Sequence, residues 1–374
     1  MQEGLPPATH TTKDGTVGLD IGPSSIAAVS SEDAILQQLC PSVVEPWNDC
    51  RRIQRAMDHV RVAENYDALH YPPDGASREA RYSRYVCKDT LLRTQTSSLV
   101  PDCLRSLRRG ESDVLLALPG LVYRRDSVDK IHSAEPHHLD LWRVTTKVVM
   151  TSVQLREAVG VILDAAIPGV EWKLEPSPHP YTQEGVEINA RWSDGWLEVG
   201  ECGLAHPEII AENLQDSVGV TGLALGMGLD RLLMVRKDIP DIRLLRSSDP
   251  RVMAQMQDLA PYREVSAMPR VVRDLSIAVA AASNNDDMGD RVREALGEEA
   301  DIVEEVRILS ETPYDELPPS AIKRMGIAEG QKNVLLRVTL HALEKTLTDE
   351  ECNAYRDVIY AAVHQGVAWE WTAR

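Results

Sequence analysis

Two arginines and an acidic strand residue are the side chains best suited to phosphate chemistry. Arg124 follows an apolar run, and Arg231 follows Gly226 and Gly228 in the string GLALGMGLDRLLM (222–234). Arginine stays charged at neutral pH and can bind a phosphate or a carboxylate through two parallel hydrogen bonds. Glycine lets backbone and ligand approach closely because it has no side chain. An arginine taken alone is more often a solvated surface residue, so residue type by itself favours the surface interpretation.

The elements that must position these residues are apolar strands with helices between them. Turns join most of the strands, which predicts an antiparallel sheet flanked by helices rather than a doubly wound parallel sheet. Glu198 lies in one of these strands, where it could also be the outward-facing position of a half-buried strand. The predicted strands are 114–120, 141–150, 186–192 and 196–203, and the predicted helix is 159–167.

The C-terminal part of the chain has a different order of elements. The segment 238–262 is predicted to be a linker. Beyond it, the order strand, helix, strand, strand, helix is typical of a ferredoxin-like α/β sandwich. The strands are predicted at 270–280, 301–311 and 333–342, and the helices at 286–299 and 348–366, the latter opened by a capping box of Thr348 and Glu351.

Composition limits the possible partners and compartments. The 374 residues include 43% hydrophobic residues, enough to bury a core in two or three domains. The net charge of -18 argues against broad, nonspecific polyanion binding, so any RNA contact must use local basic patches. No apolar run is long enough to span a membrane and no secretory signal is visible, so a cytoplasmic protein is expected. The six cysteines are scattered and indicate neither a zinc site nor a disulfide framework.

Four strings follow one another along the chain: DTLLRTQTSS (89–98), PGLVYRRDSVDKIHSAEPHHLD (119–140), PSPHPYT (176–182) with WLEVGECGLAHP (196–207), and GLALGMGLDRLLM (222–234). In this order they resemble the catalytic core of phenylalanyl-tRNA synthetases, which are class II enzymes. The strings MPRVVRDLSIAV (268–279) and EKTLTDEECN (344–353) resemble the anticodon-binding domain of the same family. The resemblance covers about residues 60–374. It implies a ligase of protein biosynthesis that uses ATP and Mg²⁺, with an amino acid and tRNA as substrates.

The resemblance divides the chain into three parts of α+β character. Residues 1–64 form an atypical N-terminal segment with a disordered lead-in (1–15), a hairpin (16–30) and a helix (44–64). Residues 65–260 form the class II core with its antiparallel sheet. Residues 263–374 form the ferredoxin-fold anticodon-binding domain, in which basic residues are available for phosphate contacts. These are Arg270, Arg273, Lys323, Arg324 and Lys332.

The family's second and third motifs imply the ATP site. Charge builds on phosphate oxygens when a carboxylate attacks the α-phosphorus, so fixed cations must stabilise it. By resemblance, Arg124 holds the α-phosphate and the substrate carboxylate, while Asp126 lies near the adenine. Arg231 holds the γ-phosphate, Gly226 and Gly228 let ATP approach, and Glu198 is the carboxylate for Mg²⁺.

The implied amino-acid pocket departs from the family pattern on the ammonium side. His137 is followed by His138 and Asp140, which replace the Gln and Glu that bind the substrate ammonium in the family. Asp140 can still pair with an ammonium, whereas His138 must be neutral to accept a hydrogen bond. In the first string Gln95 replaces the usual His, and Ser97 is retained.

The side-chain end of that pocket departs further. His179 and Tyr181 match the two stacking phenylalanines of the family, Glu201 stands where the family has Gly, and the small Ala224 is retained. A buried polar group needs a partner, so one hypothesis is an aromatic or similarly sized substrate more polar than phenylalanine. The alternative is that His179 and Glu201 satisfy each other and the specificity is unchanged.

The N-terminal segment resembles something else. Residues 16–61 are similar to the opening of transposon-encoded RuvC-like nucleases, in which the Asp of GLDIGPS, here Asp20, is one of several metal-binding carboxylates. No later segment supplies the other acids, so an unrelated or repurposed hairpin and helix is the favoured interpretation. The first class II motif and its dimer contact are therefore in doubt, and the sequence does not give the oligomeric state.

Three functions remain open at this point. The first is a tRNA-charging enzyme for phenylalanine or a related aromatic amino acid. The second is a synthetase paralogue that activates a more polar, nonstandard amino acid. The third is a noncatalytic RNA-binding paralogue, against which the retained ATP-site residues argue. His132, His137 and His206 lack zinc-site spacing and are interpreted as ordinary pocket or core histidines.

Overall fold

The computed structural model describes residues 9–11, 17–19, 51–53, 58–75, 78, 83–110, 113–124, 128–265, 268–343 and 345–368. The chain divides into two compact units. The first consists of Met1–Arg125, Glu135–Pro240 and Pro250–Arg263, and the second of Asp126–Ala134, Asp241–Asp249 and Glu264–Arg374. None of the helices in the described part of the chain combines the length and the apolar character that crossing a bilayer would require.

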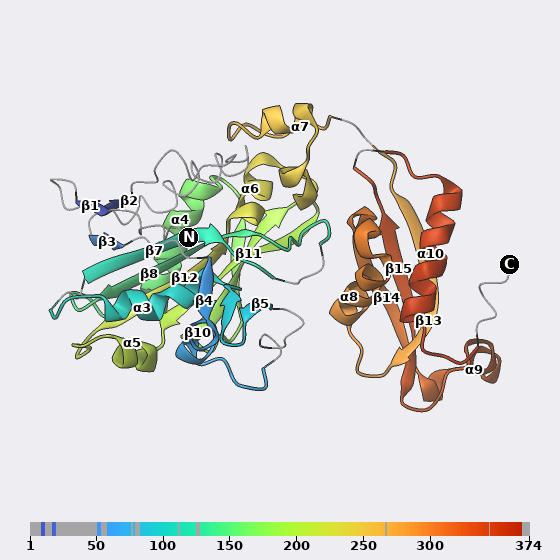
Figure 1. The fold of residues 1–374 in the computed structure, drawn as a ribbon, viewed down its shortest axis with the longest axis horizontal. Coiled ribbons are helices and arrows are strands. Elements are labelled where there is room, and N and C mark those ends of the chain that lie inside the picture. The colour runs from blue at the N-terminus through green and yellow to red at the C-terminus, as the bar shows by residue number, and fades with distance from the viewer. Residues whose placement is uncertain are drawn as a thin grey trace, which may run out of the picture. The chain divides into compact units, whose positions relative to one another are not determined.

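A seven-stranded sheet is the centre of the first unit (Figure 1). Its order is β3-β7-β8-β12-β11-β10-β9, and all neighbours are antiparallel except β3 and β7. The predicted antiparallel sheet is therefore confirmed. The strands are β3 (Arg51–Ile53), β7 (Asp113–Leu121), β8 (His137–Thr145), β9 (Trp172–Pro176), β10 (Thr182–Trp192), β11 (Gly195–Ala205) and β12 (Thr221–Gly228).

Helices cover the sheet because its central strands are apolar on both faces. In β7, five successive residues from Val114 to Leu118 are buried, as expected for a strand with packing on both sides. Helices α3 (Val100–Arg105) and α5 (Pro207–Asn213) pack on the face that contains Trp142 and Ala224. Helices α4 (Ser152–Ala166) and α6 (Leu229–Lys237) pack against β11.

A small three-stranded sheet and short helices lie between β3 and β7 in the chain. Its order is β4-β6-β5, with antiparallel neighbours. The strands are β4 (His59–Arg61), β5 (Arg84–Cys87) and β6 (Thr90–Leu92), and the short helices are α2 (Val62–Asn65) and the 3-10 helices η2 (Asp67–Leu69) and η5 (Thr96–Leu99).

The predicted helix at 44–64 is wrong for its described residues. β3 pairs in parallel with β7, β4 pairs with β6, and only α2 is helical. Backbone pairing with partners distant in sequence outweighs the local helical pattern. The lead-in, expected to be disordered, contains β1 (Thr9–Thr11), which pairs with β2 (Val17–Leu19). Asp20 and the Gly-Pro turn of the expected hairpin lie outside the described residues.

The segment predicted as a linker, 238–262, is instead folded. It contains the 3-10 helix η6 (Ile242–Arg246) and helix α7 (Pro250–Gln255). Several of its apolar side chains, among them Ile239 and Ile242, are buried. Residues 241–249 group with the second unit and 250–263 with the first.

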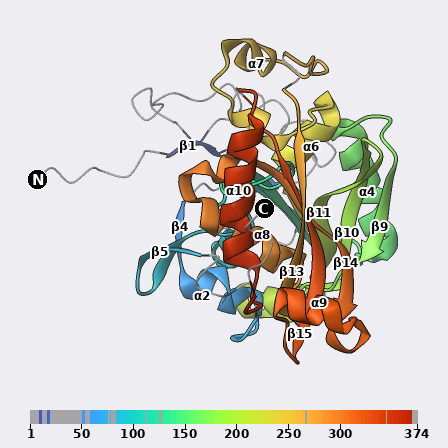
Figure 2. The same ribbon diagram turned by 90° about the vertical axis from the view of Figure 1, so that its right-hand side faces the viewer.

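The second unit is built on a three-stranded antiparallel sheet of order β13-β15-β14. β13 and β14 are parallel to each other with β15 between them, and α8 connects them, which gives a split βαβ arrangement. Helix α8 packs on α10 and β14, and α10 also packs on β13 (Figure 2). The elements are β13 (Val271–Ala280), α8 (Asn285–Leu296), η7 (Gly297–Ile302), β14 (Val303–Pro313), η8 (Tyr314–Glu316), α9 (Pro319–Met325), β15 (Gln331–Leu340) and α10 (Asp349–Val363).

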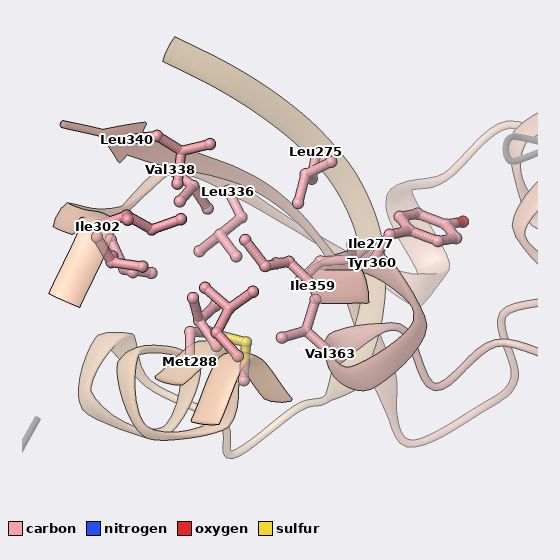
Figure 3. Packing of buried hydrophobic residues seen from close by; sticks show 14 of the residues in the cluster. Leu275, Ile277, Met288, Ile302, Leu336, Val338, Leu340, Ile359, Tyr360 and Val363 are labelled. Atoms are coloured by element: carbon pink, nitrogen blue, oxygen red, sulfur yellow. The ribbon is translucent and has the colours of Figure 1, made fainter. Parts of the chain in front are cut away.

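Aliphatic side chains from the sheet and both helices form the core of this unit. Leu336 and Val338 of β15 lie among Met288 of α8 and Ile359 and Val363 of α10 (Figure 3). All five are at most 1% exposed. Alternate residues of the strand thus provide the buried face, while the intervening residues, such as Arg337, remain accessible.

Candidate active site

Three neighbouring strands bring predicted site residues onto one face of the central sheet. Cα partners across β8 and β12 are His138 with Gly228, Asp140 with Gly226, and Trp142 with Ala224. Gly226 is also paired with Glu201 of β11, and Ala224 with Gly203. Because directly paired residues share a face, the small residues of β12 form a floor between the larger side chains of β8 and β11.

Both predicted arginines lower the pKa of one imidazole on this face, that of His138. Arg124 follows β7 and donates from Nε to the carbonyl oxygen of Thr94 at 3.0 Å. Arg231 lies on α6, whose N-cap is Gly228. Burial lowers the pKa of His138 well below 6.5, and the positive charges of Arg124 and Arg231 lower it further. His138 is therefore neutral and can accept a hydrogen bond.

A β-bulge directs Glu198 toward Arg231. Ile188 of β10 pairs with Gly200 and Asn189 pairs with Glu198, so Val199 is an extra residue in β11. A bulge interrupts the alternation of faces. Val199 is 1% exposed, whereas the Glu198 side chain is 43% exposed and its Oε2 accepts from Nη1 of Arg231 at 3.0 Å. The same Nη1 donates to the Glu198 backbone carbonyl at 3.0 Å.

Asp140 is a buried carboxylate with hydroxyl partners. It is 2% exposed and accepts from Thr96 Oγ1 at 2.6 Å and from Ser97 Oγ at 2.8 Å. Burial raises the pKa of Asp140 to about 6, against the opposing effect of the hydroxyl hydrogen bonds. A cationic group beside Asp140 would stabilise its ionised form, which is the property expected of an ammonium site.

Gln95 takes part in a second set of contacts at the same end of the first unit. Its Oε1 accepts from the Tyr71 hydroxyl at 2.7 Å, and its Nε2 donates to the Asn65 carbonyl at 2.8 Å. The pKa of Tyr71 is raised above its ordinary value because the phenol is buried and lies near the Glu201 carboxylate. The Tyr71 hydroxyl is therefore a donor throughout the physiological pH range.

His179, Tyr181 and Glu201 form one cluster. His179 Nε2 lies 3.2 Å from Glu201 Oε2, and the Tyr181 hydroxyl donates to the same oxygen at 3.4 Å. The His179 and Tyr181 rings stack with centroids 5.7 Å apart. Burial alone would raise the pKa of Glu201, but the His179 hydrogen bond and nearby positive charge hold it below 4.5. The pairing that the sequence left open as an alternative is thus present.

The remaining predicted histidines have local partners. The backbone N–H of His137 donates to Asp230 Oδ1 at 3.2 Å, and His132 Nδ1 lies 2.9 Å from Asp129. His206 is the N-cap of α5, where Nδ1 accepts from the Glu208 N–H at 3.3 Å. A ligand atom of His206 lies within 4.8 Å of those of His70 and Glu208, although His70 is already paired with Glu212 at 3.0 Å. Asp126 lies outside the described residues.

Three residues of the site were not predicted from the sequence. Thr96 lies between Gln95 and Ser97, both predicted, and only its contact with Asp140 identifies it. Trp142 could have been found because it is two residues from Asp140 on the same strand and therefore on the same face. Tyr71 comes from the loop after η2, and no local pattern points to it.

The sequence matches known families over its central part. The model of the family described as tRNA synthetases class II core domain (F) matches residues 52–256. The phenylalanine–tRNA ligase alpha subunits of Nostoc punctiforme and of Prochlorococcus marinus strain NATL2A are each 35% identical over 191 residues, covering 51% of this chain and 56% of the relative. The chain thus spans about half the length of these relatives.

Two further matches cover a larger share of the similar protein. The probable mitochondrial phenylalanine–tRNA ligase of Drosophila melanogaster is 27% identical over 362 residues, covering 81% of this chain and 75% of the relative. The crystal structure of pyrrolysyl-tRNA synthetase from Desulfitobacterium hafniense superposes with a TM-score of 0.44 at 18% identity, covering 57% and 72% of the two chains. The family model alone matches more than half of the sequence. The chain therefore belongs to the class II tRNA synthetases with a phenylalanyl-type (F) core domain.

Proposed function

We propose that this protein uses ATP to convert phenylalanine or a related aromatic amino acid into an aminoacyl-adenylate and then transfers the aminoacyl group to tRNA. The observation that carries the proposal is that Arg231 is held by Glu198 at the start of α6, which directly follows β12, while the buried carboxylate of Asp140 is paired with Gly226 of β12. The proposed site thus has two guanidinium groups close to the small residues of β12. Such groups are suited to bind a polyphosphate and the carboxylate that reacts with it.

In this proposal the phosphate site is built from β12, α6 and the segment after β7. Arg124 binds the α-phosphate and the substrate carboxylate, and Arg231 binds the γ-phosphate. Gly226 and Gly228 leave space for ATP above the sheet. Asp126 is assigned to the adenine by the family resemblance alone.

Glu198 is the proposed protein ligand for Mg²⁺. Its side chain is 43% exposed, and one carboxylate with substrate phosphates is a common way to hold this ion. Bound there, Mg²⁺ would neutralise charge that develops on the phosphate oxygens. Arg231 already contacts Glu198, so the protein itself keeps a cation at the same carboxylate when ATP is absent.

The amino acid is proposed to bind over β12 with its ammonium at Asp140. Ser97 and Thr96 fix the carboxylate, and Gln95 and the neutral His138 provide further polar contacts. Asp140 is buried and accepts hydrogen bonds from two hydroxyl groups, so a substrate ammonium beside it would stabilise its ionised form. His137, through its contact with Asp230, keeps the start of β8 against α6.

The second unit is proposed to contact tRNA. Of the basic residues expected to be available there, Arg270 pairs with Glu304, Arg273 with Asp349 and Lys332 with Glu311. Each of these pairs must open, or be shared, if the side chain is to reach a phosphate. Lys323 and Arg324 of α9 are exposed and are the first residues to test.

A specific observation favours a second candidate, a paralogue that activates a more polar amino acid. The Glu201 carboxylate lies beside Tyr181 and His179. An apolar substrate ring would offer this carboxylate no hydrogen bond, whereas a substrate side chain with a polar group would. A noncatalytic RNA-binding protein is the third candidate, and the Arg231 and Glu198 pair argues against a decayed phosphate site.

Amino-acid-dependent ATP–pyrophosphate exchange, followed by charging of total tRNA, tests the proposal. Exchange with phenylalanine and charging would support the first candidate, and exchange with another amino acid would support the second. The absence of exchange with every amino acid would overturn both and leave the noncatalytic candidate.

A further inference from the structure

Two carboxylates, those of Asp140 and Glu201, flank a glycine of the central sheet, Gly226. Asp140 of β8, Gly226 of β12 and Glu201 of β11 are consecutive Cα partners, so their Cβ directions share one face. A Cβ placed on Gly226 would lie 3.7 Å from Asp140 Oδ1, an ordinary contact. The position above Gly226 therefore has room for at least a methyl group. Asp140 and Glu201 are two strand spacings, about 10 Å, apart.

The two carboxylates differ in how they are held. Asp140 is 2% exposed, and the hydroxyls of Thr96 and Ser97 each bind one of its oxygens. The Glu201 side chain is 42% exposed, and its described contacts with His179 and Tyr181 both use Oε2. A carboxylate can accept about four hydrogen bonds. Glu201 thus has the capacity and the exposure to accept another donor.

Buried aromatic rings pack beside this carboxylate. Tyr181 is 5% exposed, and its centroid lies 6.3 Å from that of Trp142 and 6.2 Å from that of Tyr71. Trp142 and Tyr181 belong to the same buried cluster as Ala224. A flat or aliphatic substrate side chain can pack on these rings, but its end must meet the Glu201 carboxylate.

We propose that Glu201 is a specificity-determining residue that selects amino acids whose side chain ends in a hydrogen-bond donor, a hydroxyl or an amine. The proposal rests on the proposed function, because it takes Asp140 as the site of the α-ammonium. A side chain without a donor would remove water from Glu201 and give no hydrogen bond in return, which penalises plain phenylalanine.

The test compares phenylalanine with its para-hydroxyl and para-amino analogues and with lysine. Exchange kinetics on the full chain give kcat/KM, and calorimetric titration of each amino acid without ATP gives the dissociation constant. We expect a donor-bearing amino acid to be preferred over phenylalanine by at least about 10-fold. In Glu201→Gly this preference should fall to about unity or reverse, and in Glu201→Gln it should persist for the hydroxyl but weaken for the amines.

Glu187→Gln is the matched control, because Glu187 is the Cα partner of Glu201 on the next strand, β10. It should leave the preference unchanged. A wild-type preference for phenylalanine that Glu201→Gly does not alter would overturn the specificity assignment while leaving the proposed function intact. Failure of exchange with every amino acid would overturn the proposed function, and the titrations would still decide the role of Glu201. A donor-bearing amino acid that binds the wild type but not Glu201→Gly would support the specificity assignment. If no donor-bearing amino acid binds the wild type, the specificity assignment is overturned.

Discussion

Arg231 binds Glu198 twice through a single nitrogen: Nη1 donates to the backbone carbonyl and to the carboxylate of Glu198, each at 3.0 Å. The contact joins the first turn of α6 to the bulged part of β11. A guanidinium group held in this way cannot rotate freely, so little reorganisation is needed when a phosphate binds. The pair is therefore the most direct place to test the proposed phosphate site.

Arg231→Ala should abolish exchange without unfolding the protein. We expect kcat/KM to fall by at least about 100-fold, because a fixed cation at a charge-developing oxygen contributes at this scale. The free energy of unfolding should change by no more than about 1 kcal/mol, since the pair is partly exposed. Arg236→Ala on the same helix is the control. A fully active Arg231→Ala variant would refute the phosphate site.

The binding of the amino acid should weaken as the pH falls through about 6, the pKa of Asp140. Protonation removes the charge that an ammonium needs, so the dissociation constant should rise about 10-fold for each pH unit below that value. Calorimetric titration between pH 5 and 8 measures it. An affinity independent of pH over this range would exclude Asp140 as the ammonium site.

Asp140→Asn should make the protein more stable at neutral pH while abolishing amino-acid binding. The folded pKa of Asp140 is raised from 3.8 to about 6, so its contribution to stability is complete below pH 3.8 and is lost as the pH rises through 6. The neutral variant avoids this loss. Urea unfolding should show a gain of up to about 3 kcal/mol at pH 7.5 that disappears near pH 4. An equal gain at both pH values would contradict this origin.

The long strands and helices could be predicted from the sequence, but short pairings could not. β7, β10 and β11 carry apolar patterns over nine to eleven residues, and these local patterns determine strand formation. The three residues of β3 are a strand only because β7 offers them backbone partners. No pattern within 44–64 indicates pairing with β7, so the local sequence by itself favours a helix.

The candidate site divides in the same way. The family resemblance named Asp140 and Gly226 as site residues, and the structure pairs them across β8 and β12. The extra residue Val199, which lets Glu198 reach Arg231, depends on the register with β10 and has no local signature. Tyr71 is likewise brought to Gln95 by the tertiary fold alone.

Gly120→Ala should damage the site from a distance. Gly120 has φ of +150°, and a Cβ there would lie 2.1 Å from Nη2 of the buried Arg93. Arg93 precedes Thr94, whose carbonyl oxygen accepts from Arg124. We expect a loss of roughly 2 to 4 kcal/mol in unfolding free energy and reduced exchange.

Gly195→Ala is the control for Gly120→Ala, because nothing lies within 4 Å of its Cβ position. Thermal unfolding and exchange kinetics measured on both variants provide the comparison. Equal behaviour of the two variants would show that the Arg93 contact has no role in positioning Arg124.

Glu304→Gln should destabilise the second unit in a pH-dependent way. Glu304 is 4% exposed, accepts from Arg270 Nε at 2.6 Å and lies 2.9 Å from His341 Nδ1. Burial opposes ionisation, but these partners lower the pKa of Glu304 to about 2. A lowered pKa gives stability that is present above pH 4.5 and is lost as the pH falls toward 2. Hydrogen exchange in β15 should therefore show that the unfolding free energy of Glu304→Gln is lower than that of the wild type by about 3 kcal/mol at pH 7, and by less at pH 3.

Glu305→Gln, at the exposed neighbouring position, is the control and should show no such loss of stability. If the loss in Glu304→Gln did not change with pH, packing rather than charge would be the reason that Glu304 stabilises the second unit.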